Sequence, residues 1–174
     1  FMGAAIARCY YLLDRPQEPG WRLAVAVRNR DNECMLEPHI LERLAVVGYR
    51  IIGHEALWAP RLLSVVFWLL GAVALYRIGI RLSTPVGASV AVAVFLFSPF
   101  GILASRSFQP DPLMVLLELA GVLALLRFAE SESTASLLLA AALCAAAVFA
   151  KPVCLPVVAG LYCTGMARRH GCVR

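Results

Sequence analysis

The chain has 174 residues, of which 61% are hydrophobic and only 16% charged, and its formal net charge is +5. This composition, with a mean hydropathy of +0.77, excludes an ordinary soluble domain. Residues 1–60 are neutral, with seven Arg against seven Asp or Glu, so the positive excess lies among the apolar segments. No basic block is typical of a nucleic-acid surface, and we expect no nucleic-acid partner.

The first 60 residues predict amphipathic helices outside the hydrocarbon. Residues 1–14 have a helical pattern, and residues 15–32 contain two prolines and a glycine and are too short and too polar to span. A clear amphipathic helix follows over 37–53, where Gly53 is a plausible stop. Its apolar stripe consists of Ile40, Leu41, Leu44, Val47, Ile51 and Ile52. We expect residues 1–60 to form an external segment whose amphipathic helices lie in the membrane interface.

Five hydrophobic segments follow, at about 62–82, 88–104, 113–127, 135–150 and 153–168. The first is long enough to cross a hydrocarbon core of about 30 Å, and the others are near or below the usual minimum of about 17 residues. Lys151-Pro152 divides what would otherwise be one apolar run from Ala135 to Ala167. The fold class predicted is therefore all-α, a polytopic membrane bundle over residues 61–170.

The charges between these segments predict an orientation. If the five segments alternate, one membrane face carries Arg77, Arg81, Arg127, Arg168, Arg169 and Arg174. The opposite face carries Arg106, Lys151, Arg61 and the N-terminal segment. The bias in the short loops makes the first face cytoplasmic and places the turn at 105–112 outside.

That turn is the most polar interruption of the apolar region. Arg106, Gln109 and Asp111 stand between two apolar runs, where unpaired polar groups could not remain in hydrocarbon without a large cost. Pro110 and Pro112 bracket Asp111 and favour a position near the start of the next helix. Two interpretations are open: a capped turn in which Arg106 and Asp111 pair at the surface, or a functional cluster.

Several short motifs occur in a recognisable order. Glu37-Pro38 precedes a helix, and Leu57-Trp58-Ala59-Pro60-Arg61-Leu62-Leu63-Ser64 enters a span. Ser98-Pro99 is followed by Ser105-Arg106-Ser107-Phe108-Gln109-Pro110-Asp111, and Phe149-Ala150-Lys151-Pro152 forms a later turn. Over residues 4–165 this order resembles the N-terminal half of GT-C class membrane glycosyltransferases, in the branch of protein mannosyltransferases and aminoarabinose or undecaprenyl-phosphate glycosyltransferases.

The resemblance implies an inverting transfer from a polyprenyl-phosphate sugar donor to a lipid, protein or glycan acceptor at the non-cytoplasmic face. It implies an integral, multi-pass protein of the bacterial inner or plasma membrane that works without a cofactor. The family's acidic general base is expected just before the helix that holds Ala4 to Arg8, so we expect this chain to lack it. Asp14 is a weak substitute, and we expect the 174 residues alone to be catalytically silent.

The resemblance makes Asp111 and Glu37 the candidate catalytic acids. Transfer from a lipid phosphate also needs cations on the departing phosphate, for which Arg106 and Lys151 share the predicted face. Interfacial anchoring or snorkelling is the alternative for both. Glu118 lies two helical turns after Asp111 and faces either a cavity or a partner helix.

His39 and Arg8 complete the candidate substrate-binding residues, with a simple helix start and a solvated face as their respective alternatives. The six cysteines show no zinc spacing and no metal site is predicted. The competing function is a non-enzymatic membrane protein, a transporter or an assembly subunit, in which Arg106, Asp111 and Glu118 form a transport or interhelical network.

Overall fold

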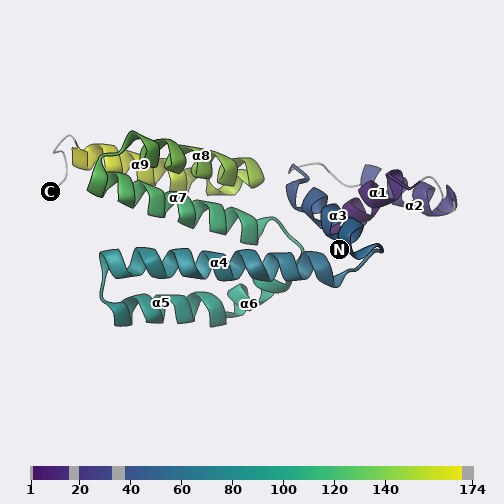
Figure 1. Ribbon diagram of the computed structural model, residues 1–174, viewed down its shortest axis with the longest axis horizontal. Helices are drawn as coiled ribbons and strands as arrows, with labels where there is room; N and C mark the ends of the chain where they lie inside the picture. The colour runs from purple at the N-terminus through teal and green to yellow at the C-terminus, as the bar shows by residue number, and fades with distance from the viewer. Residues whose placement is uncertain (1, 16–19, 33–37, 170–174) are drawn as a thin grey trace.

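The computed structural model describes residues 2–15, 20–32 and 38–169, which are helical almost throughout and contain no strand (Figure 1). The prediction of an all-α fold is confirmed. The helices are α1 (Met2–Leu13), α2 (Gly20–Asp31), α3 (Ile40–Ile52), α4 (Trp58–Leu82), α5 (Pro85–Phe97), α6 (Pro99–Arg106), α7 (Asp111–Ser131), α8 (Thr134–Ala150), the 3₁₀ turn η1 (Pro152–Cys154) and α9 (Leu155–Arg169).

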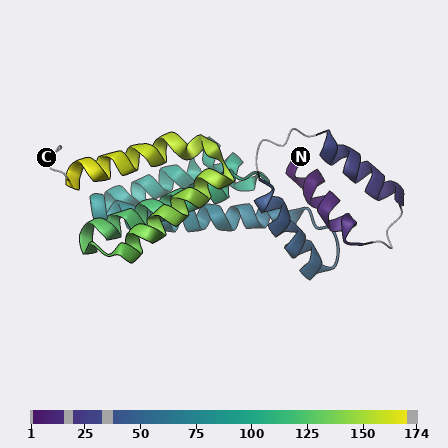
Figure 2. The ribbon, with the colours of Figure 1, turned by 90° about the horizontal axis from the view of Figure 1, so that it is seen from above.

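Helices α1 to α3 form a separate layer, here called the cap, beyond one end of the bundle made by α4 to α9 (Figures 1 and 2). Its core holds the fully buried Ala7 and Cys9 of α1, and Tyr11 packs edge-on against Tyr49 of α3 with ring centroids 5.7 Å apart. Burial raises the pKa of both the Cys9 thiol and the Tyr49 phenol, so both groups are neutral at physiological pH. Cys9 therefore serves as packing.

Helix α3 packs on the protein with one face and exposes part of the predicted apolar stripe. Leu41, Ala45, Val46 and Tyr49 are its buried residues, whereas Leu44, Val47 and Ile51 are 41, 51 and 82% exposed. The small Ala45 lets α1 approach closely, and the predicted stripe overlooked it because a hydrophobic pattern weights large side chains. The helix ends as predicted at Gly53, whose φ of +87° lies in the left-handed region.

The bundle runs back and forth from the cap, as the short loops predicted (Figure 1). Small residues bring its helices close together: a Cβ added to Gly79 of α4 would lie 2.7 Å from that of Ala88, and one added to Gly121 of α7 would lie 2.6 Å from Cys144 Sγ. Such close approach replaces the hydrophobic driving force that is missing between helices in lipid. At the far end, Arg81 pairs with Glu130 at 2.9 Å and ties α4 to α7.

The second predicted segment is bent. Helices α5 and α6 meet at an angle of 60° at Ser98-Pro99. Pro99 cannot donate a backbone hydrogen bond, and the Ser98 side chain instead caps α6 by accepting a bond of 3.0 Å from the Gly101 amide. Beyond the bend, α6 packs across α4 (Figure 1).

Within the described residues, α4 and α7 are long and apolar enough to cross a membrane, and the bent pair α5–α6 makes a third span if it is counted as one. Helix α8 and the η1–α9 segment are apolar but shorter. The predicted interruption at Lys151-Pro152 is present: α8 ends at Ala150, Lys151 adopts an extended conformation, and η1 begins at Pro152.

Candidate functional site

An ion pair joins the start of α7 to the end of α8. Lys151 Nζ donates to both carboxylate oxygens of Asp111, at 2.9 and 3.0 Å. The two side chains are 26 and 21% exposed, so the pair is shielded but reachable from solvent. Partial burial strengthens an ion pair relative to a fully exposed one.

Local sequence explains how each partner reaches the other. Pro110 is the N-cap of α7 and Asp111 is its first residue, followed by Pro112. The N-cap residue makes no side-chain capping bond, and the Asp111 carboxylate bonds Lys151. Lys151 stands at the break that Pro152 imposes between α8 and η1. Asp111 thus lies at the start of α7, as predicted, and its carboxylate bonds Lys151.

Arg106 does not take the place that the sequence suggested. It is exposed at the end of α6, and among the described residues no hydrogen bond or ion pair joins it to Asp111. The prediction paired two residues separated by five positions, whereas the partner of Asp111 is 40 positions away along the chain. The predicted alternation of the helices had put Lys151 on the same membrane face as Asp111. That shared face was the only feature of the sequence that indicated their contact.

The cap rests on the bundle close to this pair. Ile40, the first residue of α3, packs against the apolar cluster that contains Met114 of α7 and Ala150 of α8. The turn before α7 contributes Phe108, whose ring packs on the cap core beside Gly3 of α1. Both contacts fix the cap against the end of the bundle where Asp111 and Lys151 lie. Sequence periodicity carries no signal for contacts of this kind.

His39 and Arg8 belong to the cap and have partners there. The Tyr10 hydroxyl and His39 Nδ1 are hydrogen-bonded at 2.9 Å, which links α1 to the residue before α3. Tyr10 was not among the predicted site residues. Arg8 Nε lies 3.2 Å from Glu55. The weak substitute base Asp14 pairs with Arg50 at the cap surface, and Glu37 lies outside the described residues.

Glu118 lies inside the bundle, two turns along α7 from Asp111. Its Oε1 is buried and has no hydrogen-bond partner among the described residues. Tyr162 of α9 has a buried hydroxyl group beside the Cys144 thiol of α8. It lines an apolar groove of about 740 Å³ between α8 and α9, where Pro38 and Pro152 also lie. Unpaired buried polar atoms are uncommon and costly.

No group of three or more His, Cys, Asp or Glu side chains in the described part of the chain is placed to hold a metal ion. The polar groups at the cap end of the bundle include the Asp111–Lys151 ion pair, the exposed guanidinium groups of Arg61 and Arg106, and the His39 imidazole bonded to the Tyr10 phenol. The charged groups are suited to bind an anion, and the imidazole and phenol are suited to exchange a proton with a hydroxyl group.

Comparison with known proteins identifies the family. No curated protein and no solved structure matches the chain. A family model described as dolichyl-phosphate-mannose-protein mannosyltransferase matches residues 38–169, which includes α3, every helix of the bundle, and the Asp111–Lys151 pair. This agrees with the GT-C resemblance of the motifs and makes the chain a membrane glycosyltransferase of the mannosyltransferase kind. With most of its length matched, the chain belongs to the dolichyl-phosphate-mannose-protein mannosyltransferase family.

Proposed function

We propose that this protein moves a hexosyl or pentosyl group from a polyprenyl-phosphate donor to an acceptor at the non-cytoplasmic face of a bacterial inner or plasma membrane. The acceptor is a lipid, a protein or a glycan. The observation that carries the proposal is the contact of Lys151 with both oxygens of Asp111, at the end of the bundle that the cap covers. Family membership supplies the reaction class.

The reaction requires a cation where the donor phosphate departs. The acceptor hydroxyl oxygen forms a bond to C1 of the sugar, the bond from C1 to the phosphate oxygen breaks, and the acceptor proton passes to a base. The polyprenyl phosphate leaves with one more negative charge, which a fixed ammonium stabilises. We assign this role to Lys151 and give Arg106, exposed on α6 of the same end, a supporting role in attracting the phosphate.

Asp111 acts through Lys151. Its two oxygens hold the ammonium at the break between α8 and η1, so the cation is in place before the donor arrives. Asp111 is therefore a positioning residue, a narrower role than that of a catalytic acid. Glu37 remains the predicted acid on the acceptor side, and Glu118, His39 and Arg8 remain predicted to bind substrate.

A set of charge variants tests this assignment in the full-length protein, with sugar transfer from a polyprenyl-phosphate donor as the measurement. Lys151→Met should lower turnover about 10²-fold, as expected when one fixed charge is removed from a transition state. Asp111→Asn should lower turnover about tenfold, and it should add almost nothing in the Lys151→Met background because it acts through that residue.

Arg81→Met is the matched control, because it breaks an exposed ion pair with Glu130 at the opposite end of the bundle. It should leave turnover unchanged. Thermal unfolding in detergent, measured on each variant, separates loss of fold from loss of function. Normal turnover in the Lys151→Met, Asp111→Asn double variant would contradict the proposal and make the pair purely structural.

A further inference from the structure

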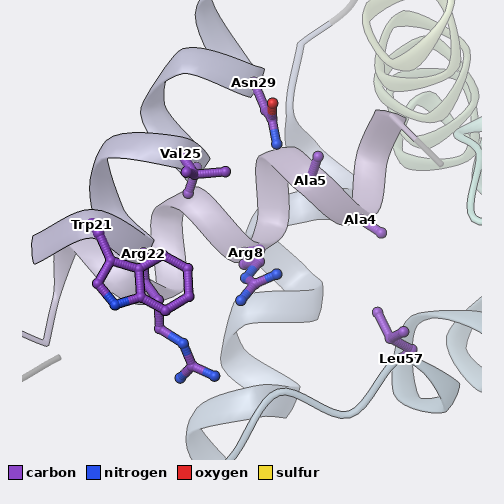
Figure 3. A pocket seen from close by; sticks show the side chains of 9 residues that line it. Ala4, Ala5, Arg8, Trp21, Arg22, Val25, Asn29 and Leu57 are labelled. Carbon is purple, nitrogen blue, oxygen red and sulfur yellow. The ribbon is translucent and has the colours of Figure 1, made fainter. Parts of the chain in front are cut away.

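A groove of about 200 Å³ lies between α1 and α2 of the cap, and it reaches Leu57 just before α4 (Figure 3). Small and branched apolar side chains of both helices form its floor. Its polar side chains come from both helices, Arg8 from α1 and Arg22 and Asn29 from α2, and Trp21 stands at its edge. Neither the ion pair of the bundle nor the family assignment accounts for this surface.

Trp21 gives the groove a flat apolar platform. Its side chain is 68% exposed, although an indole is among the most costly side chains to leave in water. The Arg22 guanidinium carbon lies 5.9 Å from the centroid of the Trp21 ring, a cation–π contact that restrains the indole at the groove edge. A large exposed aromatic ring held in one place is suited to stacking against the apolar face of a ring-shaped ligand.

The polar groups around this platform can bond the hydroxyl groups of a ligand. Asn29 offers both a donor and an acceptor, and its side chain is directed toward α1 in Figure 3. Arg8 carries five N–H donors, and its charge is compensated by Glu55, which Nε approaches at 3.2 Å. Among the residues that the structure describes, no acidic side chain lines the groove. The groove thus presents two guanidinium groups and one amide beside an aromatic surface, with the Arg22 guanidinium held against Trp21.

We propose that this groove binds a neutral oligosaccharide, with one sugar ring stacked on Trp21 and neighbouring hydroxyl groups bonded to Asn29 and Arg8. The inference rests on the proposed function, because it makes the cap the place where a glycan acceptor is held while its end reaches the bundle. A peptide acceptor is the competing occupant, but an extended peptide needs a row of backbone partners, and the groove walls are helices whose backbone groups are already bonded.

Direct binding tests the inference without depending on transfer. The full-length protein in detergent is titrated with a fluorescently labelled linear manno-oligosaccharide and, separately, with a labelled peptide rich in Ser and Thr. We expect the oligosaccharide to bind and Trp21→Ala to raise its Kd about tenfold or more, whereas Trp21→Phe should preserve most of the affinity because it keeps an aromatic face.

Two controls accompany the titration. Trp58→Ala removes another exposed indole, 58% exposed at the start of α4 and outside the groove, and should leave the Kd unchanged. Lys151→Met should also leave it unchanged, so failure of the proposed transfer reaction and failure of this inference can be told apart. Circular dichroism on each variant verifies the fold. Absence of oligosaccharide binding, an unchanged Kd in Trp21→Ala, or Trp21-dependent binding of the peptide alone would overturn the inference.

Discussion

Glu118 carries a carboxylate oxygen that is buried in the bundle without a hydrogen-bond partner among the described residues. Sequence reasoning placed this residue on the same helical face as Asp111, and the spacing of seven residues was sufficient for that. Sequence reasoning could not predict which side chains surround Glu118, because that depends on which residues of α8 and α9 lie beside α7. A polar atom in this position costs stability, and proteins retain such atoms mainly where they have a use.

Replacing Glu118 with Leu should therefore raise the stability of the chain in detergent by about 1 kcal/mol, because the variant removes a buried oxygen that has no partner and keeps a similar volume. Thermal unfolding measures the effect. Glu130→Leu is the matched control: Glu130 is an exposed acid on the same helix, paired with Arg81, and its loss should change stability by less than about 0.5 kcal/mol. A lower unfolding midpoint for Glu118→Leu would show that the carboxylate has a stabilising partner.

At the scale of the helices, α3 shows what hydrophobic periodicity can and cannot identify. The helix and its end at Gly53 were predicted correctly, because the 3.6-residue period and a glycine stop are local signals. The face that packs on α1 was not predicted: Ala45 and Tyr49 lie there, while larger aliphatic residues of the stripe stay exposed. The exposed Leu44, Val47 and Ile51 are consistent with the predicted location of this helix in the membrane interface.

Tyr49→Ala should open the cap. Tyr49 is 1% exposed and meets Tyr11 edge-on, so removing its ring should cost about 3 kcal/mol and increase amide exchange in α1 and α3 about 10²-fold. Ile51→Ala, at a position 82% exposed, should leave the exchange rates within a factor of about two. Equal exchange in the two variants would mean that α1 and α3 do not share the core described above.

At the scale of the whole molecule, the order of the helices and the single end at which Asp111, Lys151 and the cap gather followed from loop lengths and alternation. The pairing of Asp111 with Lys151 could not be predicted in this way. Several cations share that end of the bundle, and Arg106 is the one closest to Asp111 in sequence. The contacts that Ile40 and Phe108 make between the cap and the bundle could not be predicted either, because single apolar residues near a turn form no periodic pattern.

Orientation in the membrane is open to a direct measurement. In a background without native cysteines, Gln109→Cys should react with an impermeant thiol reagent in whole cells, because Gln109 is exposed in the turn that the Arg distribution places outside. Ser133→Cys is the matched control in the exposed loop between α7 and α8 at the other end of the bundle, and it should react only after lysis. The reverse pattern would invert the predicted topology.

The unequal lengths of the helices have a consequence for the surrounding lipid. With 25 residues α4 is about 37 Å long, whereas α8 with 17 residues is about 25 Å long, shorter than a hydrocarbon layer of about 30 Å. If α8 crosses the bilayer, we predict that the bilayer thins around it by about 5 Å. Thinning would bring the headgroup layer closer to Lys151 at the end of α8. A lipid phosphate moving along that surface would then meet the ammonium without being drawn out of its own layer.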